Sequence, residues 1–159
     1  MLAVATMSLA RAAPLRAQAH PRPTVPVPPL VALAISDLTF GTVLPGIPSS
    51  VSVGDPHHAG LFEINGPAGT SVRVEFALPM ALAGDGGALL AISFGPGDGF
   101  ADFDCGPGLV FNPHAPVIGA LGPTRRLHVR MGGTVLPGRP QAGGAYHATI
   151  SLTVYNLGS

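Results

Sequence analysis

Alternation of apolar and polar residues is clearest near the C-terminal end of the chain. Every second residue there is apolar or aromatic, and the residues between them are mostly polar; the apolar set is Tyr146, Ala148, Ile150, Leu152 and Val154. A period of two is expected of an extended strand that buries one face and exposes the other. We therefore predict one continuous closing strand over residues 143–155, with the apolar set pointing into the core.

Shorter apolar or alternating runs recur along the rest of the chain, separated by Gly, Pro and Asn-Gly turn signals. They predict strands at residues 31–36, 49–53, 61–65, 71–78, 89–94, 109–111, 126–131 and 134–136. Gly132-Gly133 predicts a break or bulge between the last two runs. The best helical window, residues 77–90, is interrupted by Pro79 and a glycine cluster, and residues 95–108 are expected to be irregular. Short strands at near-regular spacing predict an all-β fold, an antiparallel sandwich or barrel.

The composition is consistent with many short strands joined by turns. Of the 159 residues, 47% are hydrophobic, 22 are Gly and 18 are Pro. Charged residues make up 10%, against roughly 25% in a typical soluble domain. The formal net charge of zero gives no electrostatic basis for binding nucleic acid or an anionic membrane. Cys105 is the one cysteine, so no internal disulfide can form.

The first thirty residues divide into two predicted segments. Residues 1–19 are expected to be a secretory signal, because they contain an uncharged apolar stretch and the small-x-small cleavage site Ala17-Gln18-Ala19. That stretch is too short to span a membrane. Residues 20–30 contain five prolines and predict an extended, Pro-rich arm. Residues 31–159 then form one β domain, and we expect the chain to be secreted, periplasmic or at the cell surface.

Several segments resemble, in order, those of a bacterial secreted family. They are Leu38-Thr39-Phe40-Gly41, Phe62-Glu63-Ile64-Asn65-Gly66, residues 127–135 and Gly143-Gly144-Ala145-Tyr146. On these segments, residues 35–155 resemble the DUF4402 domain, which is distantly similar to spore-coat-U-like and chaperone–usher pilin domains. The resemblance implies an antiparallel immunoglobulin-like or pilin-like β-sandwich outside the cell, without enzymatic activity. The disulfide of typical pilins is absent.

Two groups of residues are candidates for metal binding. Asp98, Asp102 and Asp104 place three carboxylates within seven residues, and Ca²⁺ prefers oxygen ligands. Their spacing does not match an EF-hand, so a solvated loop is the favoured interpretation. His57-His58 could bind a transition metal, but adjacent residues of a strand point to opposite faces. A polar turn is favoured there, and we expect no metal or other cofactor.

Three further side chains are candidates for chemistry or recognition. Cys105 is a candidate nucleophile, yet its acidic neighbours Asp102 and Asp104 disfavour a thiolate, so a free or buried thiol is favoured. Tyr146 and Tyr155 are candidates for surface recognition, although Tyr146 also suits a core position with its hydroxyl at the sheet edge. The sequence contains no Gly-x-Ser-x-Gly, phosphate-loop or zinc motif, and we expect no enzymatic activity.

Two functions remain open at this point. The first is a secreted or cell-surface structural or adhesive protein, such as a subunit of a pilus-like assembly, whose partners are further copies or other surface subunits joined by strand addition. The second is a monomeric secreted binding module for an unidentified ligand. In the second case residues 31–36 complete the domain's own sheet, an arrangement that the short distance to residues 38–40 favours.

Overall fold

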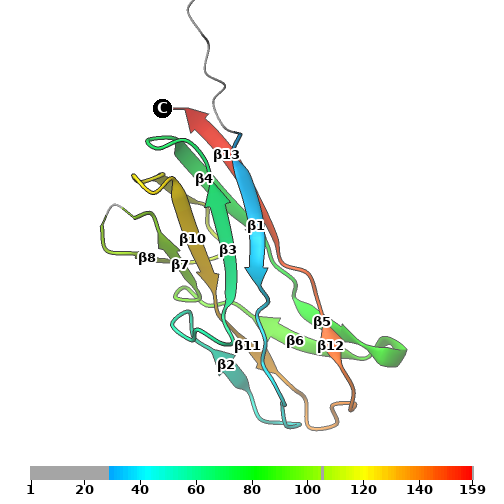
Figure 1. Ribbon diagram of the computed structural model, residues 1–159. Helices are drawn as coiled ribbons and strands as arrows, with labels where there is room; N and C mark the ends of the chain where they lie inside the picture. Colours follow the sequence, from blue (N-terminus) through cyan, green and yellow to red (C-terminus); the bar gives the residue numbers. More distant parts are fainter. Residues whose placement is uncertain (1–28, 105, 159) are drawn as a thin grey trace, which may run out of the picture.

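The chain is built from antiparallel β-strands. The computed structural model describes residues 29–104 and 106–158, which contain thirteen strands, one short 3-10 turn and no α-helix (Figure 1). The strands are β1 (Val31–Ser36), β2 (Ser49–Val51), β3 (Gly60–Asn65), β4 (Ser71–Ala77), β5 (Ala81–Gly84), β6 (Leu89–Ser93), β7 (Gly99–Asp102), β8 (Leu109–Phe111), β9 (Val117–Ala120), β10 (Arg126–Met131), β11 (Gly133–Leu136), β12 (Tyr146–His147) and β13 (Ser151–Gly158). The 3-10 turn, η1, covers Asp85–Gly87. The predicted all-β, antiparallel fold is confirmed.

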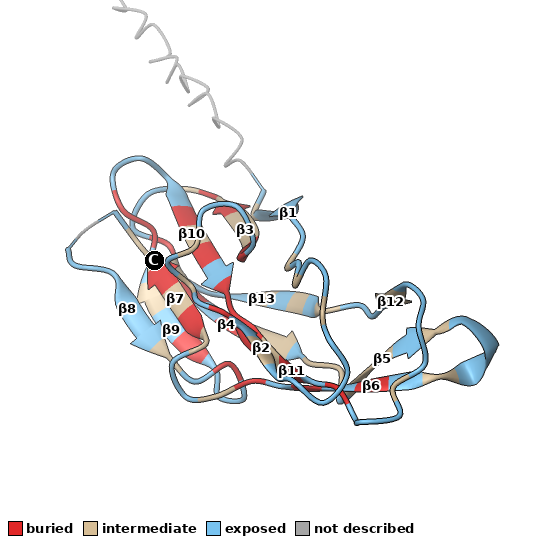
Figure 2. Ribbon diagram, turned by 90° about the horizontal axis from the view of Figure 1, so that it is seen from below, coloured by how far each residue is buried: buried red, intermediate tan, exposed pale blue. Residues whose placement is uncertain are grey.

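Two sheets share the larger core. Sheet A has the strand order β1-β3-β10-β7-β8, and sheet C has the order β13-β4-β9. Both contribute fully buried side chains to one cluster, which includes Ile64, Leu127 and Val129 from sheet A and Val72, Val74 and Val117 from sheet C. The buried residues in Figure 2 are concentrated on strands of these two sheets. The alternation predicted for residues 126–131 is confirmed, because every second side chain of β10 is buried, Leu127 and Val129 in this core and Met131 in a second one.

A third sheet supports a second, smaller core. Sheet B has the order β12-β5-β6-β11-β2 and buries Leu90, Ile92 and Val135. The chain passes from β10 in sheet A to β11 in sheet B at Gly132. A Cβ at this position would collide with the carbonyl oxygen of Val51, so the close approach requires glycine. The break predicted at Gly132-Gly133 is therefore the point where one sheet gives way to the next.

The single closing strand predicted over residues 143–155 is wrong. The structure divides it into β12, which pairs with β5 in sheet B, and β13, which pairs with β4 in sheet C. The connection between β4 and β5 contains Pro79, and these two strands lie in different sheets, so one straight strand cannot pair with both. Ile150, Leu152 and Val154 do pack against the cores, each half-buried, whereas Ala148 is exposed.

Residues 31–36 form the first strand, as predicted, and this strand pairs within its own chain. β1 lies antiparallel to β3, with Ala32 opposite Ile64 and Ala34 opposite Phe62. All six residues of β1 are exposed, and no strand of the described chain pairs with its second edge. The predicted signal and most of the predicted arm, residues 1–28, lie outside the described residues.

Three strands were not predicted. β5 falls in the window that was the best helical candidate, β7 falls in the region expected to be irregular, and β9 lies between two predicted strands. Each pairs with a neighbour in a sheet, which shows that tertiary pairing decides the conformation of these short segments. Within residues 29–104 and 106–158 there is no helix of the length and hydrophobicity needed to cross a membrane.

Candidate functional site

The three candidate calcium ligands do not come together. Asp98 precedes β7 and Asp102 ends it, so the strand holds their backbones about 13 Å apart, at roughly 3.3 Å per residue. Both carboxylates accept local hydrogen bonds, Asp98 from the Gly95 amide at 2.6 Å and Asp102 from the Asp104 amide at 3.0 Å. In residues 29–104 and 106–158, no cluster of three His, Cys, Asp or Glu side chains could hold a metal ion.

His57 and His58 lie in a polar turn organised by Asp55. The Asp55 carboxylate accepts hydrogen bonds from the backbone amides of His57 and His58, at 2.9 and 3.1 Å, and contacts the His58 ring nitrogen Nδ1 at 2.9 Å. These contacts, the His57 amide foremost, lower the pKa of Asp55 from its ordinary value. The residues thus stabilise the turn between β2 and β3, the interpretation that the sequence favoured.

The other candidates, Cys105, Tyr155 and Tyr146, do not lie together in one site of the described chain. Cys105 lies outside the described residues. Tyr155 lies on the exposed face of β13, where the Arg73 guanidinium sits 5.7 Å from the centre of its ring, and Arg73 also pairs with Glu75. Tyr146 is half-buried and packs against the second core, as expected of a core tyrosine.

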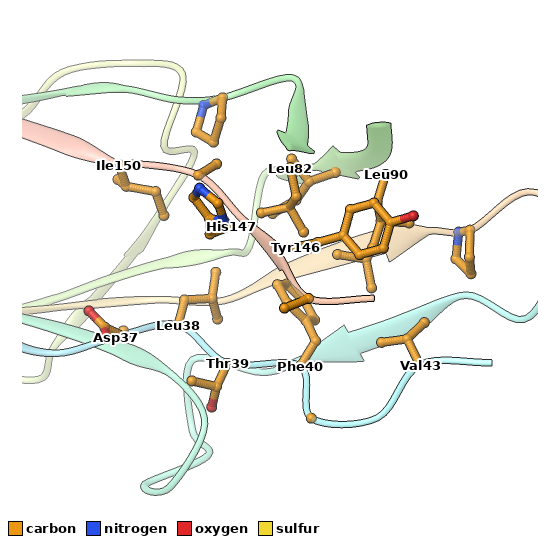
Figure 3. A pocket seen from close by; sticks show the side chains of 18 of the residues that line it. Asp37, Leu38, Thr39, Phe40, Val43, Leu82, Leu90, Tyr146, His147 and Ile150 are labelled. Carbon is orange, nitrogen blue, oxygen red and sulfur yellow. The ribbon is translucent and has the colours of Figure 1, made fainter. Parts of the chain in front are cut away.

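The described chain contains an apolar groove of about 1020 Å³. One wall is residues 38–43, which follow β1, and the other is residues 146–150, which run from β12 toward β13. Figure 3 shows Leu38, Phe40 and Val43 extending from the first wall toward the second, while Thr39 points away. The floor is lined by Leu82, Leu90, Ile92 and Val135 on the inner side of sheet B, together with Met131 at the end of β10 in sheet A.

The walls of the groove carry unpaired backbone groups. The first wall is anchored near its start by the Thr39 amide, which donates to the His58 carbonyl oxygen at 2.9 Å, and beyond its end by the Gly46 amide, which donates to Gly138 at 3.1 Å. Between these anchors, residues 40–43 form no backbone hydrogen bond with any described residue, and neither do residues 148 and 149 in the opposite wall. Amide and carbonyl groups with no partner are what an added extended segment uses for pairing.

The groove is almost without charge. Among the described residues that line it, Asp37 and His147 are the only ionisable side chains besides Tyr146. An apolar floor between walls with free amides and carbonyls suits an extended, largely uncharged peptide, because alternate side chains can face the floor while the backbone pairs with a wall. One signal for the groove is present in the sequence, the apolar alternation of Leu38 and Phe40. Nothing in the sequence pattern indicates that residues 38–43 lie opposite residues 146–150.

Tyr146 fixes the second wall to sheet B. Its hydroxyl donates to the Ala142 carbonyl oxygen at 2.6 Å and accepts from Nε2 of Gln141 at 2.7 Å, and the Gln141 amide also donates to the Leu89 carbonyl oxygen. Its ring lies against Gly84, where a Cβ would collide with it. Tyr146 therefore positions the wall.

We expect Tyr146→Phe to lower the free energy of unfolding by about 0.5–1.5 kcal/mol, the usual net value of a hydrogen bond. The ring and its packing are retained, so the loss reports the hydroxyl alone. Urea unfolding measures the change, and Tyr155→Phe is the matched control, since no hydrogen bond is formed by that hydroxyl in the described structure. Equal effects of the two substitutions would contradict the anchoring role of Tyr146.

A polar cluster on the outer face of sheet A centres on Glu63. The Asn65 side-chain amide donates to its carboxylate at 2.8 Å, and Nε2 of His128 lies 3.1 Å from it. These two contacts, Asn65 foremost, lower the pKa of Glu63 below its ordinary value of 4.5. A carboxyl whose pKa is lower in the folded state stabilises the fold above its unfolded pKa, and this stabilisation is lost as the pH falls through the folded pKa.

We therefore expect the Glu63 carboxyl to titrate below pH 4.5 in the folded chain, and at its ordinary value in urea. Carbon-13 NMR of the carboxyl gives both midpoints. Asn65→Ala removes the main stabilising hydrogen bond and should raise the folded midpoint. Identical midpoints in the folded and unfolded chain would show that the cluster does not favour the ionised form.

Comparison of the chain with protein-family models, with curated proteins and with solved structures found no match. The resemblance to the DUF4402 domain therefore stays a prediction, and the functional argument depends on the geometry of the groove and the sheet edges.

Proposed function

We propose that this chain is a non-enzymatic structural or adhesive protein of the bacterial cell surface or extracellular space, such as a subunit of a pilus-like assembly. Its β domain corresponds in this proposal to an immunoglobulin-like or pilin-like sandwich, formed by sheets A and C over their common core. Other subunits join it by adding an extended strand. The export signal predicted for residues 1–19 and the low content of charged residues agree with a location outside the cytoplasm.

The observation that carries the proposal is the apolar groove, whose walls hold backbone amides and carbonyls without a hydrogen-bond partner among the described residues. A monomer that needed no partner would gain by pairing residues 40–43 or by covering the apolar floor, since exposed edges promote association. The described sheets also end in free edges, and three of these edge strands are β1 of sheet A, β12 of sheet B and β13 of sheet C. Exposed apolar side chains lie on two of these edge strands, Ile35 on β1 and Leu157 on β13.

Labelling of intact cells tests the location, and mass measurement tests the association. We expect an antibody to the β domain to label unpermeabilised producing cells, and the purified chain to form species larger than a monomer as its concentration rises. Labelling only after permeabilisation, together with a monomer at all concentrations, would contradict the proposal.

The groove also supports the second candidate function, a monomeric secreted module that binds an extended ligand from another source. In that case the purified chain stays monomeric and is secreted. Sedimentation velocity separates this candidate from the structural subunit, because only the subunit gives a mass that increases with concentration.

A further inference from the structure

We propose that the outer face of sheet A binds an acidic polysaccharide, a sugar polymer whose units carry carboxylate groups. The face consists of the side chains of β1, β3, β10, β7 and β8 that point away from the larger core, and these strands lie side by side (Figure 1). Strand register and parity place on it Val31, Leu33, Leu61, Glu63, Asn65, Phe100, Asp102, Val110, Arg126, His128 and Arg130. None of these residues lines the groove, so the inference goes beyond strand addition and is tested separately from it.

Arginines are concentrated at this face. Three of the eight arginines of the chain lie within residues 125–130, in and just before β10. Arg126 and Arg130 are exposed, and their parity is opposite to that of the β10 side chains that enter the core. Both guanidinium groups therefore belong to the outer face, and Arg125 lies in the turn at its end.

The three guanidinium groups are available to an external anion. Within residues 29–104 and 106–158, none of the arginines of residues 125–130 forms an ion pair or a side-chain hydrogen bond. Glu63, on the neighbouring strand, is instead bonded by Asn65 at 2.8 Å and contacted by His128 at 3.1 Å. Arg73 on sheet C shows the contrast, because an ion pair and an aromatic ring hold its guanidinium group. An exposed guanidinium group without an internal partner is well suited to a carboxylate, which it can bind with two parallel hydrogen bonds.

A hollow at one end of the face can seat a carboxylated sugar. Its volume is about 400 Å³, and Arg125 and Arg126 line it together with Thr124, Pro29 and Val31. A sugar ring placed there would pack on the proline and the valine, with its carboxylate within reach of two guanidinium groups. The hydroxyl group of Thr124 is a further hydrogen-bond donor.

Arg125 has a backbone conformation that arginine rarely adopts. Its φ is +66°, in the left-handed region that favours glycine. The turn itself is fixed by backbone hydrogen bonds, since the Arg125 carbonyl oxygen accepts from the Gly66 amide at 3.1 Å and the Arg125 amide donates to Gly122 at 2.9 Å. Glycine would form the same hydrogen bonds without strain. An arginine retained at such a position supports a role for its side chain outside the fold.

The middle of the face favours a sugar polymer over a densely charged one. His128 lies between Glu63 and Asp102 in the sheet, and this row separates Arg126 from Arg130. These two arginines are about 13 Å apart along β10, at roughly 3.3 Å per residue. Double-stranded nucleic acid carries one negative charge per about 1.7 Å of its axis and would bring phosphates against the two carboxylates. An acidic polysaccharide can place hydroxyl groups there, which donate to carboxylates, and its own carboxylates at the arginines.

Apolar side chains flank the charged row on the same face. Leu33 of β1 is opposite Glu63, and Phe100 of β7 lies between Arg130 and Val110 of β8. Leu33 and Val110 are exposed, and Phe100 is half-buried. Sugar rings present C–H groups that pack on apolar and aromatic side chains, and binding sites commonly combine such surfaces with a few polar groups. Charge alone would not require the apolar part of the face, whereas a sugar polymer uses both parts.

Isothermal titration calorimetry with polygalacturonate tests the inference on the chain that begins at His20. The methyl ester of the same polymer is the ligand control, because it keeps the sugars and lacks the charge. We expect polygalacturonate to bind, the methyl ester to bind at least about tenfold more weakly, and the binding of polygalacturonate to weaken as salt is added. Absence of binding, or equal binding of the two polymers, would overturn the inference.

Two pairs of substitutions locate the binding surface. Arg126→Gln/Arg130→Gln removes two charges from the outer face of sheet A and should weaken binding of polygalacturonate about tenfold. The control Arg73→Gln/Arg139→Gln removes the same charge elsewhere and should change the affinity by less than about twofold. Equal losses from the two pairs would show that only net charge matters and would reject the proposed surface.

Arg125→Gly separates binding from folding. We expect this variant to bind polygalacturonate several-fold more weakly while its urea unfolding midpoint stays the same or rises, because glycine relieves the left-handed conformation. A lower unfolding midpoint together with unchanged affinity would show that Arg125 serves the fold and would remove it from the site.

Two further measurements exclude other occupants of the face. A double-stranded DNA oligonucleotide that binds as tightly as polygalacturonate, with the same loss in Arg126→Gln/Arg130→Gln, would show a general anion surface and reject the polysaccharide. Sedimentation velocity of that variant should match the original chain, since the groove does not use these residues. Loss of self-association in place of polysaccharide binding would make the face a contact between copies and reject the inference. A chain that binds polygalacturonate and stays monomeric would support the inference while contradicting the proposed assembly.

Discussion

Leu127→Ala is expected to lower the free energy of unfolding by about 2–5 kcal/mol, the range for a buried leucine that leaves a cavity. Leu127 is fully buried on β10, at the centre of the core shared by sheets A and C. β10 pairs with β3 on one side and with β7 on the other, so its neighbours cannot collapse into the space without distorting two ladders. A typical domain is stable by only about 5–15 kcal/mol, so the loss is a large fraction of the total.

Two substitutions in β13 provide the controls for this result. Leu152 packs against the same core but is half-buried, so Leu152→Ala should cost about 1–2 kcal/mol, less than burial of a whole leucine side chain contributes. Thr153→Ala lies on the exposed face and should change the free energy of unfolding by less than about 0.5 kcal/mol. Urea unfolding gives all three values. The order Leu127, Leu152, Thr153 is the prediction, and a larger effect for Leu152 than for Leu127 would contradict the burial pattern.

Removal of β1 is expected to make the domain aggregate. A chain that begins at Asp37 lacks the strand that pairs with β3 along its length. The edge of β3 would then present free amides and carbonyls beside Phe62 and Ile64, which is a template for pairing with other chains. Size-exclusion chromatography and thermal unfolding measure the outcome.

The matched control begins at Pro29 and keeps β1 while removing the rest of the arm. It should be soluble and should unfold cooperatively, since the removed residues lie outside the described fold. A stable monomer from the chain that begins at Asp37 would show that β1 is dispensable to the domain, and would reopen the possibility that residues 31–36 pair with another copy.

Much of the sheet structure could be predicted from period-two alternation. Alternating apolar residues predicted strands at 61–65, 71–78 and 126–131, and an apolar run predicted one at 31–36. Each is present in the structure, the second of them as Ser71–Ala77. Alternation could not reveal the division of the last strand. Tyr146, Ala148 and Ile150 continue the pattern of β13 without interruption, and the break arises because β4 and β5, the partners of β13 and β12, lie in different sheets.

The groove could not be predicted for a related reason. Its walls are about one hundred residues apart in sequence, by the count from residues 38–43 to residues 146–150, and neither wall is a regular strand along its whole length. Ala148 illustrates the difficulty, because its parity predicted a core position and the structure exposes it in the groove. The groove exists because no strand lies between its two walls. A pattern of neighbouring residues in the sequence cannot predict that arrangement.

Hydrogen exchange at the groove walls tests the central claim, that this groove is where a partner strand is added. The backbone amides of residues 40–43 and 149 would be followed by mass spectrometry in dilute and in concentrated samples of the same chain. We predict that these amides, which have no hydrogen-bond partner among the residues the structure describes, exchange more slowly once the chain assembles. Assembly without a change at these amides, or a chain that remains monomeric with the same rapid exchange at every concentration, would contradict the account.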